Sequence, residues 1–592
     1  MIFYEKLGLA HLLSLLLTKK RVFYGGQSIA TRLFEKLNIK INATRISFGD
    51  VQTSTDIRKN AYLTAELYLD NIKGKQWADE LSGALAIDFS LIAKKVFFNG
   101  VYFKYEFIGL ALKYAQEHPN ESHVIYVDEQ FLGSYKDKLK ENFKLKILRN
   151  YERINFLSIF TLPIFLWYFW KKSAATCSLF FNNKIICKVD GEGLYEMFST
   201  IFQALPAKEF VIEKEYATAF SKERLAELQI KVLGLNKNDY LYLRHAVYQY
   251  IFCCVKHYGK ISSYRGKLFD IFYVLIRGKS IAIEGTGNLF FTHEHMVPAS
   301  AARNEFLRSD GNRSIFLPLH SYATNRYYYD EIFINLDVMC AVGKHHIDIY
   351  KARRAITSVF LPTGSYNSHR GYVNIQSRAE RIARLKAFKG DSVAVTILSP
   401  GICDPTYSHE VRLMKLARDI SMQQGIKVFI RTKPMPPAAK YASFYDTYTA
   451  GCDSILLTFS EYELTDFLDV TDLFVTSISG SACDLAMCGG QVMFIDYLKD
   501  TDLFLYWTAI KEVVLTEEES FQTIMDWVRD GECGQIREDY RKNMQKLSDY
   551  LGYQFPDFDS YKANLLAQLR STFKNHPALV EIERDSKNHA PD

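Results

Sequence analysis

The sequence predicts an α/β protein made of two doubly wound domains and a C-terminal helical extension. Over most of the chain, short apolar runs alternate with amphipathic stretches, a pattern typical of parallel sheets covered by helices. The pattern is interrupted in the turn-rich stretch LPTGSYNSHRGY, which has no hydrophobic period. The chain has 592 residues, too many for a single hydrophobic core.

The interruption marks the domain boundary. A basic helical pattern, Ser377–Phe388, follows it, and the alternation of strands and helices then starts again. We therefore expect an N-terminal domain over residues 1–375, a C-terminal domain over 388–515, and helices with a polar tail over 516–592.

The N-terminal part contains most of the apolar runs. We expect strands over Val22–Tyr24, Val124–Val127, Leu145–Leu148, Phe210–Ile212, Ile230–Val232, Ser280–Glu284, Ser314–Leu317 and Asp337–Val342. We expect helices over Tyr102–Gln116, Asp239–Tyr258 and Lys267–Ile276, and from about Ala299 and Lys344. Polar or ionisable residues follow several of these strands. Ligands bind at the carboxyl ends of strands in open α/β sheets, so this edge is the expected active-site rim.

The C-terminal part repeats the alternation. Strands are expected over Val393–Leu398, Lys427–Ile430, Ser454–Leu457, Leu473–Val475 and Val492–Ile495, with helices from about Ser408 and near Glu463. Three further helices are expected over Glu517–Arg529, Ile536–Leu551 and Asp559–Thr572.

The stretch Asp472–Asp496, DLFVTSISGSACDLAMCGGQVMFID, predicts a β-α-β unit with a Ser/Gly-rich first turn. Its hydroxyl side chains at Ser477, Ser479 and Ser481 precede a helix whose positive dipole end suits a phosphate. The alternative is ordinary helix capping, because serine is a preferred cap with or without a ligand. Both interpretations stay open on this spacing.

Composition excludes some classes of function. The net charge of +6 is small and dispersed, which does not predict nucleic-acid binding. The ten cysteines show no C-x-x-C spacing, so neither a zinc site nor a disulfide framework is indicated, and a reducing cytoplasm is expected. The 38 tyrosines and 42 phenylalanines favour large aromatic cores and also suit a sugar that stacks on rings.

Two apolar runs bear on membrane contact. Leu7–Leu17 has no basic segment before it and no small-residue cleavage site, so we expect a first helix and no signal peptide. Phe156–Trp170, followed by Lys171 and Lys172, is too short to span a bilayer and ends in aromatic and basic residues. This pattern over residues 156–172 favours peripheral membrane contact, and the alternative is a buried core helix.

Several motifs at strand ends resemble those of known enzymes. Glu284-Gly285 is similar to an acidic-Gly motif, and Lys433-Pro434 stands where a His-Pro motif is expected, with lysine in place of histidine. The Ser477–Ser481 loop is similar to a Ser-Ser/Thr motif. The sequence thus resembles the GT-B glycosyltransferases of bacterial surface-polysaccharide assembly, namely CMP-Kdo and sialic acid transferases and CDP-glycerol glycerophosphotransferases. The motif-level resemblance covers roughly residues 280–500.

The resemblance implies two Rossmann-like domains, the first for the acceptor and the second for a nucleotide-sugar donor. It selects Glu284 as the base that takes the acceptor's proton, and the other candidates for catalysis are His293, Glu294 and His295. The residues expected to bind the donor are Lys433, Pro434, Ser477, Ser479, Ser481, His320 and Ser399. A His-x-His pair also suggests a metal, but no third ligand is spaced nearby, so no metal ion or cofactor is expected.

The expected protein is therefore a glycosyltransferase at the inner face of the cell membrane. Its partners would be a nucleotide sugar, above all a CMP-activated acidic sugar of the Kdo, sialic or pseudaminic type, and a surface glycan or lipid-linked acceptor. The alternatives are a UDP- or CDP-activated donor, a nucleotide-sugar epimerase, and a non-catalytic scaffold of the same fold.

Overall fold

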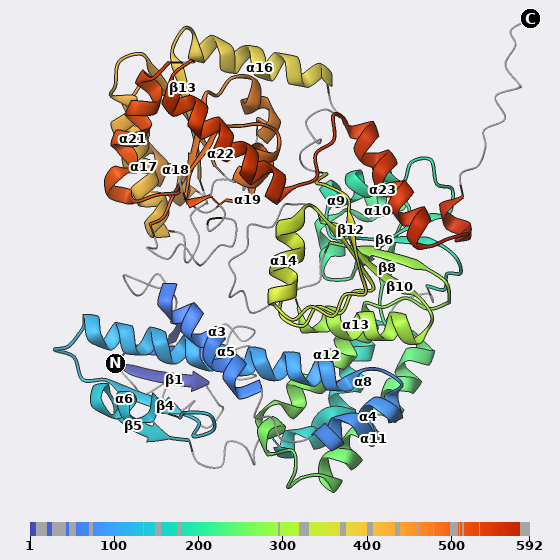
Figure 1. Ribbon diagram of the computed structural model, residues 1–592. Coiled ribbons are helices and arrows are strands. Elements are labelled where there is room, and N and C mark those ends of the chain that lie inside the picture. Colours follow the sequence, from blue (N-terminus) through green and yellow to red (C-terminus); the bar gives the residue numbers. More distant parts are fainter. Residues whose placement is uncertain are drawn as a thin grey trace, which may run out of the picture.

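The computed structural model describes residues 1–6, 21–26, 43–46, 55–69, 75–133, 135–148, 156–174, 179–293, 297–318, 331–366, 375–399, 407–432, 439–458, 461–477, 479–497, 507, 510–511, 514–531 and 533–580. These residues form three parallel sheets with helices packed against them (Figure 1). In each sheet the strand order reverses after the first strand, so each is doubly wound. The α/β fold class predicted from the alternation of strands and helices is confirmed.

The first sheet has five strands in the order β3-β2-β1-β4-β5. The strands are β1 (Ile2–Lys6), β2 (Val22–Gly26), β3 (Ala43–Arg45), β4 (Val124–Val127) and β5 (Lys144–Ile147). The helices of this part are α3 (Thr55–Leu69), α4 (Lys75–Leu85), α5 (Phe89–Glu117) and α6 (Tyr135–Asn142). α5 begins where the side chain of Asp88 accepts a hydrogen bond from the backbone N–H of Leu91, and it packs along β1 and β2.

The second sheet has seven strands in the order β12-β11-β10-β9-β6-β7-β8. The strands are β6 (Ile185–Val189), β7 (Lys208–Glu213), β8 (Ile230–Leu233), β9 (Leu289–Thr292), β10 (Arg313–Phe316), β11 (Val338–Ala341) and β12 (Val359–Pro362). Its helices are α8 (Leu162–Ser173), α9 (Glu192–Ile201), α10 (Lys222–Glu227), α11 (Lys237–Lys256), α12 (Leu268–Ser280), α13 (Pro298–Ser309) and α14 (Lys344–Ala352). The inner strands β6, β9 and β11 are buried at every position, as expected of strands covered on both faces.

The third sheet has six strands in the order β15-β14-β13-β16-β17-β18. The strands are β13 (Val393–Leu398), β14 (Ile426–Arg431), β15 (Ile455–Thr458), β16 (Leu473–Thr476), β17 (Val492–Ile495) and β18 (Val514–Leu515). Its helices are α16 (Ile375–Lys389), α17 (Tyr407–Ser421), α18 (Ala439–Thr449), α19 (Gly480–Met487), α21 (Glu517–Arg529) and α22 (Gln535–Leu551), with the 3₁₀ helix η7 over Leu464–Asp469. α16 is held to this sheet by an ion pair of 2.5 Å between Arg381 and Asp466.

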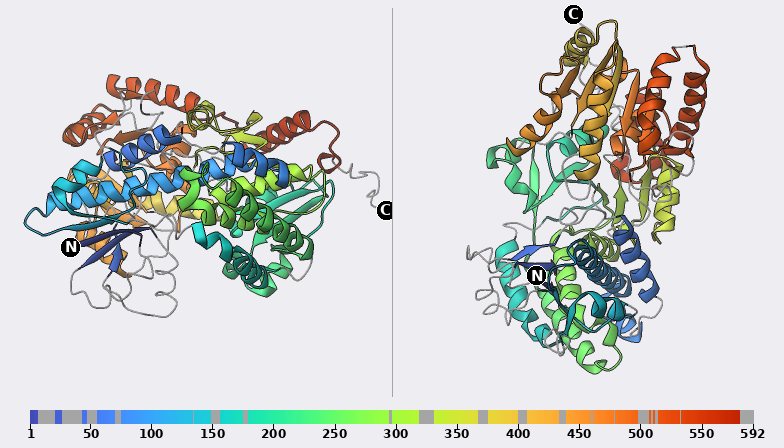
Figure 2. Two further views of the ribbon diagram at one scale, coloured as in Figure 1. Left: turned by 90° about the horizontal axis from the view of Figure 1, so that it is seen from below. Right: turned by 90° about the vertical axis from the view of Figure 1, so that its left-hand side faces the viewer.

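The cores show how the sheets are joined. One apolar cluster contains residues of the first sheet together with α11, α12 and α13, so the first two sheets share a helical layer (Figures 1 and 2). Gly278 of α12 allows a close approach to α13, because a Cβ atom there would lie 2.4 Å from that of Ala302. After α22 the chain returns to the second sheet, and α23 (Phe558–Thr572) packs on it through Tyr561 and Leu565.

Most predicted elements are confirmed within a residue or two. The predicted strands at 124–127, 393–398 and 492–495 coincide with β4, β13 and β17, and the predicted helix at 517–529 coincides with α21. The predicted helix at Leu7–Leu17 lies outside the described residues.

The strand predicted over Ser280–Glu284 is wrong. α12 extends to Ser280, and the next strand, β9, begins only at Leu289. Ile281 and Ile283 are apolar because they pack into the core at the end of α12, and beyond them only an isolated bridge joins Glu284 to Phe180. β9, which leads to His293, is the central strand of the seven-stranded sheet.

Candidate active site

The point where the strand order reverses in the second sheet lies between β6 and β9. Asp190 directly follows β6 and His293 directly follows β9, so both stand at the carboxyl edge of the sheet. The Nε2 atom of His293 lies 3.1 Å from Oδ2 of Asp190. Ligands of doubly wound sheets bind outside the carboxyl ends of the strands at this reversal. The pair is therefore the leading candidate for chemistry in this sheet.

Both side chains of the pair reach solvent. The Asp190 side chain is 26% exposed and that of His293 is 18% exposed. His293 Nδ1 is buried and, within the described part of the chain, has no hydrogen-bond partner. With Nε2 directed to Asp190, the imidazole can orient the carboxylate, and the second carboxylate oxygen remains for a ligand hydroxyl.

The predicted base Glu284 lies elsewhere. It precedes β9, whereas His293 follows that strand, so the two residues stand at opposite edges of the sheet. Gly285 has φ +97°, and a Cβ atom there would lie 1.8 Å from the carbonyl oxygen of Phe181. The Glu284-Gly285 dipeptide therefore builds a tight turn against residues 179–183, where glycine is required by the backbone. The structure does not bring Glu284 together with His293.

The third sheet reverses between β13 and β16. Ser399 directly follows β13 and Ser477 directly follows β16, so two of the predicted donor residues flank this reversal. The strand ends are tied together by Thr476, whose Oγ1 donates a hydrogen bond of 2.9 Å to the carbonyl oxygen of Leu398. The predicted residues Ser399 and Ser477 are thus close together, at the edge where a nucleotide is expected.

The two serines differ in their contacts. The hydroxyl of Ser399 is buried and donates to Glu410 Oε1 at 2.5 Å, and Tyr445 donates to the same oxygen at 2.9 Å. Ser477 Oγ instead lies 3.3 Å from Nδ1 of His409. This arrangement indicates a structural role for the Ser399 hydroxyl and leaves the Ser477 side of the reversal as the better ligand site.

His409 was missed by the sequence analysis. It is 4% exposed, and burial together with the nearby positive charge of Arg412 lowers its pKa to about 4. The imidazole is therefore neutral at pH 7 and contributes a hydrogen-bonding group, with no charge, beside Ser477. No local sequence signal marks it, because it is one polar residue near the start of an amphipathic helix.

The predicted phosphate loop leads into α19. Ser479 is the N-cap of this helix, but its side chain makes no capping hydrogen bond, and Ser481 follows in the first turn. Both residues are half-buried. The hydroxyls of Ser479 and Ser481 therefore stand at the amino-terminal end of α19, where the helix dipole favours a negative charge.

Contacts between the second and third sheets involve the loops at their carboxyl edges. Ser365, in the loop after β12, donates a hydrogen bond of 3.2 Å to Asp484 of α19. The carbonyl oxygen of Val342, directly after β11, accepts a bond of 2.8 Å from the N–H of Tyr553, which lies two residues beyond α22. α22 packs against both α14 and α19 (Figure 1). The carboxyl edges of the two sheets therefore border the same region of the molecule.

The other predicted site residues cannot be placed. Glu294, His295, His320, Lys433 and Pro434 lie outside the described residues. Among the residues that are described, no group of three His, Cys, Asp or Glu side chains is arranged to hold a metal ion.

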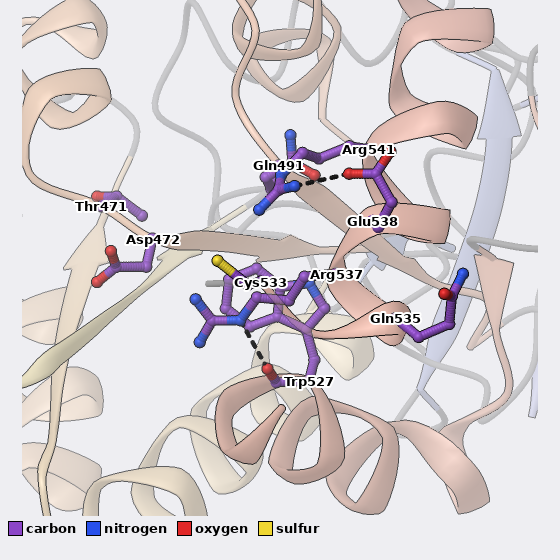
Figure 3. Close-up of a pocket in the computed structure, with 9 residues that line it drawn as sticks. All are labelled: Thr471, Asp472, Gln491, Trp527, Cys533, Gln535, Arg537, Glu538 and Arg541. Atoms are coloured by element: carbon purple, nitrogen blue, oxygen red, sulfur yellow. Dashed lines mark hydrogen bonds and ion pairs between the residues drawn. The ribbon is translucent and has the colours of Figure 1, made fainter. Parts of the chain in front are cut away.

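One pocket in the described structure lies away from this region. It has a volume of about 740 Å³ and is lined by residues just before β16 and β17, among them Asp472 and Gln491, and by residues of α21 and α22 (Figure 3). These two residues precede their strands, so the pocket lies at the amino-terminal edge of the third sheet. Its two arginines form hydrogen bonds with other residues of the pocket: Arg537 donates to the Trp527 carbonyl oxygen, and Arg541 donates to Glu538.

Comparison with known proteins gave structural matches only. No protein family and no curated protein matches the sequence. S. aureus MnaA, solved with UDP, matches 66% of this chain and 96% of its own at 10% identity, with a TM-score of 0.41. The wall teichoic acid polymerase TagF matches 65% of this chain and 88% of its own at 10% identity, with a TM-score of 0.37. A UDP-N-acetylglucosamine 2-epimerase matches 67% and 97% at 10% identity, with a TM-score of 0.36. At these TM-scores the matches do not assign the chain to a family.

Proposed function

We propose that the protein is a GT-B glycosyltransferase that takes a sugar from a nucleotide-activated donor. One observation carries the proposal: the carboxyl edges of two doubly wound sheets border one region and present complementary chemistry. The edge of the second sheet presents the Asp190–His293 pair, at 3.1 Å. The edge of the third presents serines at the positive end of α19. A carboxylate for a proton and a helix terminus for a phosphate are what glycosyl transfer requires.

The donor half of the site is assigned to the third sheet. The leaving group of a nucleotide sugar is a phosphate, which gains negative charge as the glycosidic bond breaks. Ser479 and Ser481 at the amino-terminal end of α19 would bind it, and the helix dipole stabilises the added charge. Ser477 and neutral His409 stand beside them as uncharged hydrogen-bonding groups.

The acceptor half is assigned to the second sheet. The acceptor's hydroxyl oxygen attacks the anomeric carbon, and the bond from that carbon to the phosphate oxygen breaks, with the electron pair leaving on the nucleotide. Asp190 takes the hydroxyl proton, while His293 orients the carboxylate by donating from Nε2. Glu284 is the base that the resemblance implies, and it lies at the other edge of this sheet. A variant of Glu284 is therefore the comparison for a variant of Asp190.

The choice of donor is based on the motifs at the strand ends. We propose a CMP-activated acidic sugar of the Kdo, sialic or pseudaminic type, transferred to a surface glycan or lipid-linked acceptor at the inner face of the membrane. The Ser477–Ser481 loop supports a donor phosphate, and the resemblance alone supports the choice of CMP. UDP- or CDP-activated donors are the competing hypothesis.

Thermal unfolding of the purified protein with CMP, CDP, UDP and GDP tests the proposal. A ligand that binds only the folded protein stabilises it, by about 2.7 kcal/mol at a hundredfold excess over its Kd. We expect CMP to raise the unfolding midpoint most. A shift with UDP or CDP alone would overturn the CMP assignment, and no shift with any of the four would favour a scaffold. Conversion of a donor without release of its nucleotide would identify an epimerase.

A further inference from the structure

An exposed apolar face is formed by α8 and α11. Its side chains include apolar residues between 50% and 70% exposed on α8, on the turn before it and on α11, among them Leu157, Phe160, Ile164, Trp167, Tyr248 and Phe252. We call these six residues the α8–α11 face. The sequence predicted membrane contact for residues 156–172 only. The sequence predicted an ordinary helix for α11, and the structure shows that α11 also contributes exposed apolar side chains to this face.

The two helices lie side by side and antiparallel. Trp170 near the end of α8 packs on Tyr240 near the start of α11, with ring centroids 4.8 Å apart. At the other end, Phe156 packs on Tyr258 at 4.5 Å. Leu162, Leu166 and Val247 are buried in the shared core beneath. Because the two helices pack on each other and each turns one side to this core, their other sides are exposed next to each other.

The charge around this surface is mostly positive. Residues 156–174 and 237–256 contain the exposed cations Lys171, Lys172, Lys237, Arg244 and Lys256, of which Lys256 pairs at 2.8 Å with Glu80 of α4. Their only carboxylate, Asp239, is buried and lies 3.2 Å from Lys279 of α12. An apolar face with a mostly cationic rim complements a surface of negative charge. A second copy of the same face would instead bring like charges together, which disfavours self-association.

The face begins at the edge of the second sheet that carries Asp190. The Nζ atom of Lys214, directly after β7, donates 2.6 Å to the carbonyl oxygen of Lys172 at the end of α8. Ala174 forms a bridge with Leu235, two residues after β8. β7 is the neighbour of β6, and neighbouring strands lie about 4.8 Å apart, so the catalytic edge and the face are adjacent.

We propose that the α8–α11 face docks on an anionic lipid bilayer. Docking would hold the carboxyl edge of the second sheet near the membrane surface, where the hydroxyl of a lipid-linked acceptor can reach Asp190. The helices lie on the surface and do not cross it, since none in the described ranges is long and apolar enough to span a membrane. The proposal rests on the proposed function only for the nature of the acceptor.

Sedimentation of the full-length protein with vesicles tests this proposal. The probes are vesicles of phosphatidylcholine and of phosphatidylcholine with 30 mol% phosphatidylglycerol (about 0.15 M salt). We expect binding to the anionic vesicles that weakens as salt is raised. Phe252→Glu on α11 and Ile164→Glu on α8 should each weaken it at least about tenfold, because each removes a large apolar side chain and adds a negative charge.

The matched control is Met422→Glu. Met422 lies in the part of the chain that forms the third sheet, and its side chain is 64% exposed, similar to those of Phe252 and Ile164. This variant should bind as the unaltered protein does. Unchanged binding by Phe252→Glu, or no binding of the unaltered protein to anionic vesicles, would overturn the proposal. A solution dimer that Phe252→Glu dissociates would also overturn it, by making the face a self-association surface. CMP binding, measured on the same variants, should not change, so failure here is distinct from failure of the donor assignment.

Discussion

The Nε2 atom of His293 lies 3.1 Å from Oδ2 of Asp190, and the two residues end the two strands between which the second sheet reverses its order. The two residues are far apart in the sequence. The parallel register of β6 and β9, in which Ile185 pairs with Leu289 and Cys187 with Phe291, brings their carboxyl ends together. The contact gives the sheet one oriented carboxylate at the position where doubly wound sheets bind ligands.

If His293 acts by orienting Asp190, the donor group at Nε2 matters more than the imidazole ring. His293→Gln places an amide N–H near the same position and should keep most of the turnover. His293→Ala removes the donor and should lower kcat by about tenfold or more, with little change in nucleotide affinity. Steady-state kinetics of the two variants checks this. Equal losses in both would show that the ring itself takes part in the reaction.

The serines at α19 should matter for the nucleotide more than for the fold. Ser479→Ala with Ser481→Ala should weaken CMP binding, measured by calorimetry, while the unfolding midpoint changes little because Ser479 makes no capping hydrogen bond. Thr516→Ala is the control, since Thr516 caps α21 through a reciprocal capping box. That variant should lose about 1 kcal/mol of stability and bind CMP normally. Normal CMP affinity in the double serine variant would remove the phosphate loop from the account.

Stability should fall in mild acid because of His409. Its pKa is lowered to about 4 in the folded protein, so between roughly pH 6.5 and 4 the unfolded chain takes up the proton first. Stability from the neutral imidazole is fully present above about pH 6.5, and about 3 kcal/mol is lost by pH 4. Burial and the nearby His345 also lower the pKa of His346, to about 3, so His346 contributes to the same loss of stability. The contribution of His409 is therefore measured as the difference between the unaltered protein and a variant without His409.

The measurement for His409 is the unfolding midpoint against pH for the unaltered protein and for His409→Asn. The variant should show the smaller decline between pH 6.5 and 4. Parallel curves for the two proteins would mean that His409 is not held neutral in the folded state.

The hydrogen bond from Ser365 to Asp484 should contribute to holding the second and third sheets together. Both side chains are 3% exposed, and the bond measures 3.2 Å. Ser365→Ala should cost about 1–3 kcal/mol of unfolding free energy, because a buried carboxylate loses a donor. Ser309→Ala, which removes a bond within one helix, is the comparison and should cost less. A loss no larger than that of Ser309→Ala would show that this bond does not join the sheets.

The elements that local pattern could predict are those with strong periodicity. The unit Leu473–Ile495 is readable from sequence because its two strands and serine-rich turn are contiguous, and Ser477 and Ser479 follow from it. Asp190 could not be found this way. It is one carboxylate after a strand that the analysis did not single out, and its importance depends on His293, which the fold supplies from a distant segment.

The misplacement of Glu284 has a related cause. Ile281 and Ile283 produced a strand-like pattern, although they only bury the end of α12. An acidic-Gly pair is common, and the pair at 284–285 is explained by the turn that Gly285 forms. Asp190-Gly191 is another acidic-Gly pair, and it lies at the carboxyl edge of the sheet, so only the strand order distinguishes the two positions.

The measurement that tests the account most directly is transfer of labelled sugar from a CMP-activated donor into a lipid extract, for Asp190→Asn and for Glu284→Gln. We expect Asp190→Asn to lower turnover by about 10²–10⁴, with CMP affinity unchanged, because asparagine cannot take the acceptor's proton. Glu284→Gln should transfer at a rate close to that of the unaltered protein. Near-normal transfer by Asp190→Asn, with a large loss in Glu284→Gln, would contradict the assignment of the active site to the carboxyl edge of the second sheet.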